Sequence, residues 1–205
     1  MLSLVRLPFI TFLLVANTCF WIFPLMFFAL LKLLSPSKGL RKLNYLAVRQ
    51  MASNWAACVN WVFKNLTPIK ITFSGQEALR KNESLLVLSN HQTGVDIPVL
   101  MQTLQGKTPF YTFFLKKELI WLPLIGLACW ALEFPFVRRY TRAQVEANPE
   151  LKGKDLAITK KACQRLEGIP VALINFVEGT RFTPAKHQQQ NSPYKHLLKP
   201  KAGGV

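Results

Sequence analysis

The stretch LLVLSNHQTGVDIPVL, residues 85–100, joins a short apolar run to a polar turn and then to the start of a helical pattern. Residues 85–88 predict a buried strand, and residues 97–104 predict a helix with Pro98 in its first turn. The turn between them contains His91 and Asp96. A strand followed directly by a helix is the repeating unit of α/β domains. The stretch therefore predicts a fold class and a place to look for chemistry.

Strand-like runs alternate with helical runs over the rest of the chain after residue 68. We expect strands at residues 69–73, 85–88, 110–115, 134–137 and 171–177, and helices at residues 97–104, 117–132 and 155–167. This alternation predicts an α/β fold with a mainly parallel sheet flanked by helices. Ligand sites in such sheets lie in the loops after the carboxyl ends of the strands. His91 and Glu178 both follow predicted strands, so we expect both at that edge.

The N-terminal part of the chain is apolar over the length of a membrane helix. The 25 residues from 7 to 31 carry no charge and lie between Arg6 and Lys32. This run is longer and bulkier than the apolar part of a signal peptide. We therefore expect residues 1–34 to form a hydrophobic membrane anchor. Pro24 would break or kink a continuous helix, so the anchor either spans the bilayer or bends back within one leaflet.

Positive charge follows the anchor and predicts that the rest of the chain lies on the cytoplasmic side of the membrane. The residues concerned are Lys32, Lys38, Arg41 and Lys42. Residues 35–68 contain an amphipathic helix, which either packs on the globular core or lies at the membrane interface with Trp55 and Trp61 at headgroup depth. Residues 69–205 form the remaining α/β domain.

The composition limits the class of partner. The 205 residues include 26 Lys and Arg against 10 Asp and Glu, a formal net charge of +16. Such a charge favours a polyanion, which could be nucleic acid, an anionic lipid surface or a phosphorylated substrate. The four cysteines are widely spaced, which predicts reduced packing residues, and no spacing of ligands predicts a metal site.

His91 and Asp96 can form a catalytic pair only across a turn. On one helix, positions five apart point about 140° away from each other. Across a strand-to-helix turn, Asp96 can accept a hydrogen bond from one imidazole nitrogen and leave the other free to take a proton. No serine or cysteine is placed as a nucleophile, so the attacking group would be a substrate hydroxyl. The plainer interpretation is a polar turn with Asp96 at a helix N-terminus.

Three sequence blocks carry a resemblance to a known family. NHQTGVD (residues 90–96), FVRR (residues 136–139) and VEGTR (residues 177–181) occur in this order behind an apolar N-terminus. Together they resemble the glycerolipid acyltransferases of the lysophosphatidate (1-acylglycerol-3-phosphate) acyltransferase family, of the bacterial inner-membrane type. The resemblance covers roughly residue 43 to the end and makes residues 69–205 an acyltransferase catalytic domain.

The resemblance implies roles for the residues of these blocks. His91 would be the general base on the acceptor hydroxyl and Asp96 its orienting partner, with direct attack on the thioester of acyl-CoA or acyl-carrier protein and no other cofactor. Arg139 would bind the phosphate of the acceptor, for which the forked guanidinium is suited. The remaining residues associated with the acceptor would be Glu178, Gly179, Thr180 and Arg181.

The sequence departs from the family pattern in two places. Arg138 stands where the family usually has an acidic or amide residue, which leaves the headgroup of the acceptor open. A fourth family block, an apolar strand containing proline, does not occur before residue 205. We therefore expect the catalytic domain to be truncated at its C-terminus.

We expect a membrane-bound enzyme that transfers a fatty acyl group to lysophosphatidate and forms phosphatidate. Its partners would be the lysophospholipid, the acyl thioester or acyl-carrier protein, and an anionic membrane, with the bacterial inner membrane as its location. One alternative is an acyltransferase that remodels another lysophospholipid. Another is a basic membrane-tethered module that binds nucleic acid or acidic lipid without catalysis, but aromatic residues interleaved with basic ones are not apparent on a strand, so nucleic acid is not expected.

Overall fold

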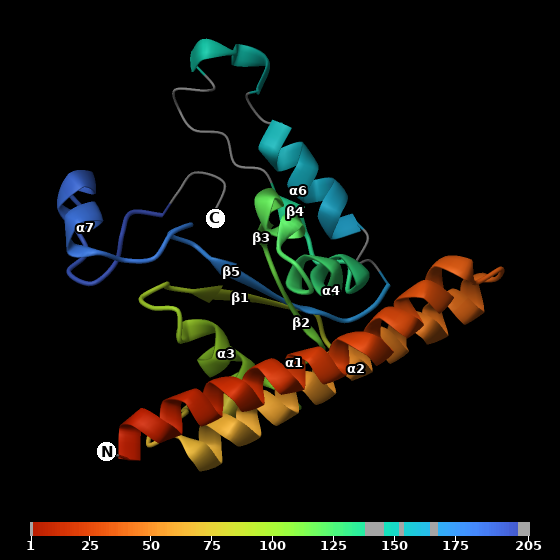
Figure 1. Cartoon of the computed structure of the whole chain (residues 1–205). Coiled ribbons are helices and arrows are strands. Elements are labelled where there is room, and N and C mark those ends of the chain that lie inside the picture. Colours follow the sequence, from red (N-terminus) through yellow and green to blue (C-terminus); the bar gives the residue numbers. More distant parts are fainter. Residues whose placement is uncertain (1, 138–145, 152–153, 165–167, 201–205) are drawn as a thin grey trace.

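The centre of the protein is a parallel β-sheet. The computed structural model describes residues 2–137, 146–151, 154–164 and 168–200 (Figure 1). Three strands, β1 (Leu85–Ser89), β5 (Ala172–Phe176) and β2 (Tyr111–Phe113), pair in the order β1-β5-β2. Two shorter strands, β3 (Leu115–Lys116) and β4 (Phe136–Val137), form a second parallel pair. All these pairings are parallel, and helices flank the sheet, so the predicted α/β fold class is confirmed.

The register of the sheet brings two predicted motifs together. β1 and β5 are parallel neighbours, with Leu85 opposite Ala172 and Ser89 opposite Phe176. Their carboxyl ends therefore lie side by side, and the residues that follow each strand emerge at the same edge. This places the turn after residue 89 next to the turn after residue 176, as the sequence predicted.

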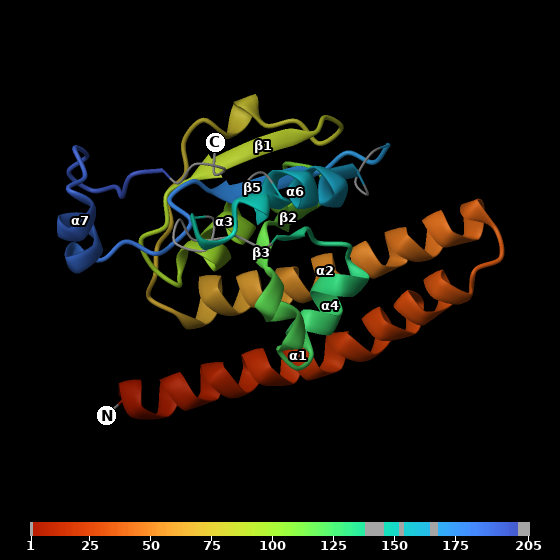
Figure 2. The ribbon, with the colours of Figure 1, turned by 90° about the horizontal axis from the view of Figure 1, so that it is seen from above.

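Two long helices form a layer beneath the sheet. α1 (Leu2–Leu34) and α2 (Lys38–Leu66) run antiparallel along one face of the molecule (Figures 1 and 2). The Ser37 side chain accepts a hydrogen bond from the Leu40 amide and caps α2, which explains why the chain restarts as a helix there. The two helices are joined along their length, because the Arg6 side chain donates to the Leu66 carbonyl and the Asn17 side chain donates to the Trp55 carbonyl.

α1 is a continuous helix. Pro8 and Pro24 both lie inside it, so of the two expected effects of Pro24, a break or a kink, the break does not occur. Within the described residues, the segment from Val5 to Leu34 is long and apolar enough to cross a membrane. Only 17% of its most apolar window is buried, and large apolar side chains such as Phe12 and Phe23 are exposed.

α2 is amphipathic, and its apolar face is covered by protein. Its buried residues are Tyr45, Val48, Arg49, Ala52, Ala56, Val59 and Val62. Trp55 is half-buried, packs against the core and donates its indole N–H to the Thr18 hydroxyl at 3.1 Å. Trp61 is 59% exposed. Packing on the core therefore accounts for most of the apolar face of α2.

A buried lysine ties α1 to the domain. Lys32 is 5% exposed, and its ammonium donates to the Ala131 carbonyl at 2.7 Å and to the Glu133 carboxylate at 3.2 Å. The Tyr45 hydroxyl donates to the Leu132 carbonyl beside them. Lys32 is therefore not part of the exposed positive charge after α1, whereas Lys38, Arg41 and Lys42 are exposed.

Shorter elements complete the described part of the fold. The helices are α3 (Asp96–Leu104), α4 (Ile125–Ala131), α6 (Lys154–Gln164) and α7 (Pro184–Gln190), and the 3-10 turns are η1 (Gln76–Ala78), η2 (Lys117–Trp121) and η3 (Pro149–Leu151). Residues 69–73 form no strand. The strand expected at residues 110–115 is divided between the two sheets, and the helix expected at residues 117–132 is interrupted at residues 122–124.

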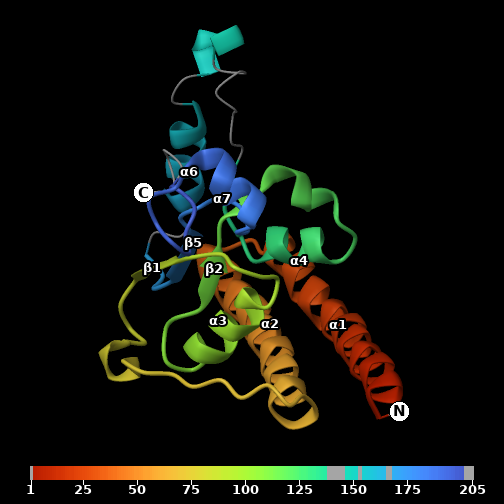
Figure 3. The same cartoon turned by 90° about the vertical axis from the view of Figure 1, so that its left-hand side faces the viewer.

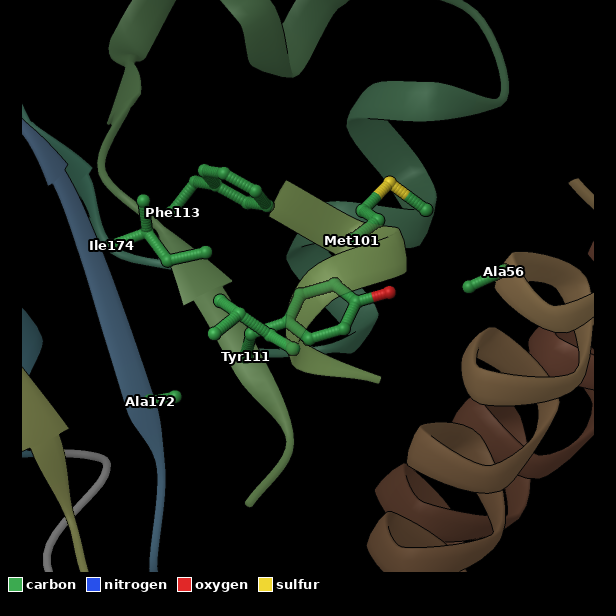
Figure 4. Packing of buried hydrophobic residues seen from close by; sticks show 7 residues of the cluster. Ala56, Met101, Tyr111, Phe113, Ala172 and Ile174 are labelled. Atoms are coloured by element: carbon green, nitrogen blue, oxygen red, sulfur yellow. The ribbon is translucent and has the colours of Figure 1, made fainter. Parts of the chain in front are cut away.

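Two apolar clusters join the layers. One links α2 and α3 to the sheet through Ala56, Met101, Leu104, Tyr111, Phe113, Ala172 and Ile174 (Figure 4). The other links α1, α2 and the end of α4 through Leu25, Ala29, Val48, Ala52, Ala131 and Leu132. The two-helix layer is therefore part of the core. Its removal would expose apolar area worth roughly 25 cal/mol for each Å².

Candidate active site

His91 and Asp96 meet across the turn between β1 and α3. The Nδ1 atom of His91 lies 2.8 Å from Oδ2 of Asp96. Their side chains are 17% and 21% exposed, so the pair is largely shielded but reachable. With Nδ1–H donating to the carboxylate, the neutral imidazole has its lone pair on Nε2. The arrangement can take a proton from a hydroxyl group placed at Nε2.

Several contacts fix the orientation of His91. Its ring stacks on that of Phe176, the last residue of β5, with 4.2 Å between the ring centroids. Its carbonyl oxygen accepts a hydrogen bond from the Phe182 amide at 2.7 Å. Its own amide donates to Oε1 of Glu178 at 3.4 Å. His91 is thus held by the last residue of β5 and by the segment that follows that strand.

Asp96 accepts four hydrogen bonds and is held in the ionised form. Oδ2 accepts from His91 and from the backbone amides of Gln92 and Thr93, at 2.7 Å and 2.9 Å, and Oδ1 accepts from the Thr93 hydroxyl at 3.1 Å. Partial burial raises the pKa of Asp96, but the hydrogen bonds from His91, Thr93 and Gln92 together lower it more, so the pKa lies below its ordinary value. The carboxylate also lies in the first turn of α3, where the helix dipole favours negative charge.

Glu178 is a buried residue that contacts backbone. It is 1% exposed, and besides the His91 amide it accepts the Leu198 amide on Oε2 at 3.2 Å. It is not among the described residues that line the cavity next to His91. The sequence resemblance associates Glu178 with the acceptor, and that assignment stays a prediction. In the structure, its carboxylate joins the turn after β5 to His91 and to the segment around residue 198.

The next three residues of the VEGTR block lie at the cavity. Gly179 has φ of +64°, a left-handed conformation that explains why glycine stands here. Thr180 and Arg181 both line the cavity, and the Arg181 guanidinium approaches Gly94 in the turn beside His91. Lys186 of α7 lines it as well and donates to the Thr180 hydroxyl at 2.7 Å.

Sequence reasoning missed two contributors to this geometry. Phe176, which stacks on His91, is the last residue of an apolar strand and carries no polar group that would mark it as part of a site. Lys186 returns to the site because Thr183 caps α7 and Pro184 opens it, a helix-start signal that is visible in the sequence.

A large apolar cavity begins at His91. Its volume is about 650 Å³, within the usual range for small-molecule sites. Its walls come from both long helices, the sheet, η2 and α4. Apolar members of the lining include Trp21, Leu25, Trp55, Met101, Phe113, Leu119, Ile125 and Leu132. An unbranched hydrocarbon chain fits such a lining, because it would lose contact with water without leaving polar groups unsatisfied.

Cys129 lines the cavity but is a poor nucleophile. Burial raises the pKa of its thiol to about 11, so at neutral pH it is almost entirely protonated. The four cysteines are free thiols. Cys129 therefore does not supply an activated thiolate for a reaction at His91, which agrees with attack by a substrate hydroxyl.

The FVRR block is only partly within the described residues. Phe136 and Val137 form β4, and Val137 lines the cavity. Arg139, the predicted phosphate ligand, lies outside the described residues, as do Arg138 and Arg142. The prediction for Arg139 stays as the sequence made it.

Comparisons with known proteins agree with the motifs. The chain is 34% identical over 133 residues to 1-acyl-sn-glycerol-3-phosphate acyltransferase 3 of Arabidopsis thaliana, covering 62% of this chain and 32% of that protein. It is 27% identical over 132 residues to the human 1-acyl-sn-glycerol-3-phosphate acyltransferase alpha, covering 64% and 41%. The chain thus spans less than half the length of these relatives.

A solved structure shares the fold. The 1-acyl-sn-glycerophosphate acyltransferase PlsC from Thermotoga maritima superposes with a TM-score of 0.58 at 21% identity, covering all of this chain and 69% of that one. The acyltransferase family model matches residues 70–204, which is about two thirds of the chain and includes all three sequence blocks. The chain therefore belongs to the acyltransferase family.

Proposed function

We propose that the protein transfers a fatty acyl group from a thioester donor to the free hydroxyl of lysophosphatidate and so forms phosphatidate. The observation that carries the proposal is the hydrogen-bonded His91–Asp96 pair, whose histidine lines an apolar cavity of about 650 Å³. The pair supplies a base and the cavity supplies a place for a hydrocarbon chain. The names of the relatives point to the same acceptor class.

The chemistry begins at Nε2 of His91. It takes the proton of the acceptor hydroxyl while the oxygen attacks the carbonyl carbon of the thioester. Asp96, ionised and hydrogen-bonded to Nδ1, stabilises the imidazolium that forms. The carbon–sulfur bond then breaks, and the imidazolium returns its proton to the leaving thiolate. The products are an ester and a free thiol, and His91 is regenerated.

Positive side chains near His91 favour a phosphorylated acceptor. Arg181 and Lys186 line the cavity, and an arginine can bind phosphate through two parallel N–H donors. We assign Arg139 the same task on the strength of the sequence resemblance. Thr180 adds a hydroxyl group at the same wall. Glu178 acts as a positioning residue, because it holds the His91 amide from a buried place.

The protein works at a membrane surface. α1 exposes apolar side chains along its length but is hydrogen-bonded to the rest of the chain near both ends. Arg6 donates to Leu66 at the end of α2, and Lys32 donates to the Ala131 carbonyl at the end of α4. A helix held in this way lies along the domain. This favours insertion of α1 into one leaflet over a helix that crosses the bilayer away from the domain. We assign the catalytic domain to the cytoplasmic side of a bacterial inner membrane, with anionic lipids attracted by the net charge of +16.

The test is thiol release in reconstituted membranes with the wild type, His91→Ala and, as a matched control, His196→Ala. His196 is exposed, and its contact to Gln92 uses the backbone carbonyl, which the substitution leaves in place. Oleoyl-CoA and acyl-carrier protein serve as alternative donors. We expect release to require lysophosphatidate, to survive in His196→Ala and to fall by about 10²- to 10⁴-fold in His91→Ala.

The outcomes separate the alternatives. Full activity of His91→Ala would rule out the base assignment. Release with another lysophospholipid but not with lysophosphatidate would change the acceptor and keep the mechanism. Binding of anionic vesicles without thiol release from any donor and acceptor would favour the non-catalytic module.

A further inference from the structure

The segment of η2 and α4 carries an unusually apolar outer surface. Between residues 121 and 130, six large apolar side chains are at least 40% exposed, and Trp121 reaches 84%. They are Trp121, Leu122, Leu124, Ile125, Leu127 and Trp130. Single exposed apolar residues are ordinary, but a dense group of this kind marks an interaction site.

This segment, residues 117–131, is compact and has two faces. We call it the apolar wedge. Its inner face, formed by Leu119, Ala128 and Cys129, lines the cavity at His91. Leu124 and Ile125 belong to both faces, because they line the cavity and are also 40% and 56% exposed. Trp121, Leu122, Leu127 and Trp130 are not among the described lining residues and form the outer face. A Cβ atom on Gly126 would lie 2.1 Å from the Ile120 carbonyl oxygen, so α4 packs directly against η2.

The apolar wedge lies against α1. Leu25 and Ala29 of α1 share a buried cluster with Ala131 at the end of the wedge, and Trp21 and Leu25 of α1 line the same cavity as the wedge. Figures 2 and 3 show α4 beside α1, with β1 on the opposite side of the molecule. The outer face of the wedge therefore continues the exposed apolar surface of α1.

Charge at the base of the wedge identifies the kind of partner. Lys116 and Lys117 are both exposed and precede the apolar residues, with the exposed Glu118 after them, so this stretch keeps a net charge of +1 (two lysines less one glutamate). A pair of lysines next to exposed tryptophans is suited to the boundary of an anionic bilayer, where headgroups meet acyl chains. A folded protein partner would not require the apolar surface to continue onto a helix with the length and composition of a membrane helix.

We propose that the apolar wedge inserts into an anionic lipid leaflet beside α1, with Trp121 at the boundary between headgroups and acyl chains. The proposal rests on the proposed membrane association of α1 and is independent of the proposed acyl transfer. The leaflet and the cavity then lie on the two faces of the same fifteen-residue segment. A hydrocarbon chain that moved from the leaflet into the cavity would then pass across this one segment.

The experiment measures the depth of Trp121 in vesicles of phosphatidylcholine and phosphatidylglycerol. Wild type and Trp121→Phe are reconstituted as full chains, and the difference between their emission spectra is the signal of Trp121. Phosphatidylcholine brominated near the headgroup quenches tryptophan in the leaflet, and iodide quenches tryptophan in water. A Leu86→Ser variant, altered at an exposed residue of β1, is the control for nonspecific effects on reconstitution.

We expect a blue-shifted difference emission that loses most of its intensity with the brominated lipid and little with iodide. The Leu86→Ser variant should show the same quenching. If the protein floats with the vesicles but the difference emission responds to iodide alone, or to neither quencher, the wedge lies in water or under a protein partner and the proposal is wrong. If the protein does not float with the vesicles, the membrane association of α1 fails and the wedge proposal fails with it, while thiol release still tests the acyl transfer separately.

Discussion

Asp96 determines which nitrogen of His91 can act as a base. Its carboxylate accepts hydrogen bonds from Nδ1–H of His91 and from two backbone amides, so the imidazole is oriented before any substrate binds. Glu178 supports the same residue from the buried side through the His91 amide. The two acidic residues therefore have different tasks: one acts on the ring and the other on the backbone.

The lowered pKa of Asp96 links stability to pH. A carboxyl group whose pKa is lower in the folded than in the unfolded protein stabilises the fold fully above its unfolded pKa of about 3.9, and this contribution is lost as the pH falls through the folded value. Asp96→Asn removes the contribution. We expect the melting temperature of Asp96→Asn to lie below that of the wild type at about pH 6 and the gap to narrow below about pH 4. Thermal unfolding in detergent measures it, and a gap that widens on acidification would contradict the assignment.

Gly179 is required by its backbone conformation. At φ of +64° a Cβ atom is strained, so Gly179→Ala should destabilise the fold by about 1–2 kcal/mol. Gly39 lies near the start of α2 with no atom within 4 Å of a Cβ, so Gly39→Ala should be neutral or stabilise by up to about 1 kcal/mol. Denaturant unfolding of both variants measures the contrast, and equal effects would argue against a conformational cause.

At the scale of elements, α4 separates the cavity from the outer surface. Cys129 lines the cavity, whereas Leu127 belongs to the outer face and is 49% exposed. Cys129→Phe should shorten the space for an acyl chain and lower kcat/KM for a long donor relative to a shorter one by about 10-fold or more. Leu127→Phe is the matched control and should leave the preference unchanged. A series of acyl-CoA lengths tests both, and equal shifts in the two variants would remove α4 from the acyl site.

Elements with a strong local pattern could be predicted from the sequence. β1 and α3 follow the apolar run and the helical spacing around His91, and their junction places Asp96 where the sequence required it. The strand expected at residues 69–73 is not formed. Those residues pair with no described strand, and Ile69 is 45% exposed. The break in the helix at residues 122–124 follows from Pro123 and from Leu124, whose φ is +62°.

Part of the candidate site could be predicted from the spacing of its residues, and part could not. The spacing showed that His91 and Asp96 can meet only across a turn, and the structure has this contact. Their roles as base and orienting partner came from the resemblance of the three sequence blocks and stay a prediction. The place of Glu178 could not be predicted, because a glutamate after a strand can face either a cavity or neighbouring amides, and tertiary packing decides which. The stacking of Phe176 on His91 depends on the register of β1 and β5, which no local pattern specifies.

At the scale of the whole molecule, Lys32 connects the layer of α1 and α2 to the α/β domain. Lys32→Met would leave Glu133 without its cation, and because that carboxylate keeps 24% exposure we expect a loss of about 1–3 kcal/mol, less than for a fully buried pair. Adding Glu133→Gln to Lys32→Met should restore part of the lost free energy of unfolding. Lys38→Met changes an exposed lysine and should stay within about 0.5 kcal/mol of the wild type. The free energies of unfolding of these variants, measured in detergent, test this prediction. If Lys32→Met were as stable as the wild type, the ion pair would not hold the layers together.

The bonds of Lys32 also set an order of events during synthesis. α1 is translated first, yet Ala131, whose carbonyl Lys32 contacts, follows 99 residues later. At about 5–20 residues per second, roughly 5–20 seconds separate the two on the ribosome. Through that interval α2 can pack against one side of α1, and the apolar surface that α2 does not cover would need lipid to cover it. On the proposed membrane association, the nascent chain is therefore delivered to the bilayer while still being made, and the sheet assembles afterwards onto a helix that is already in place.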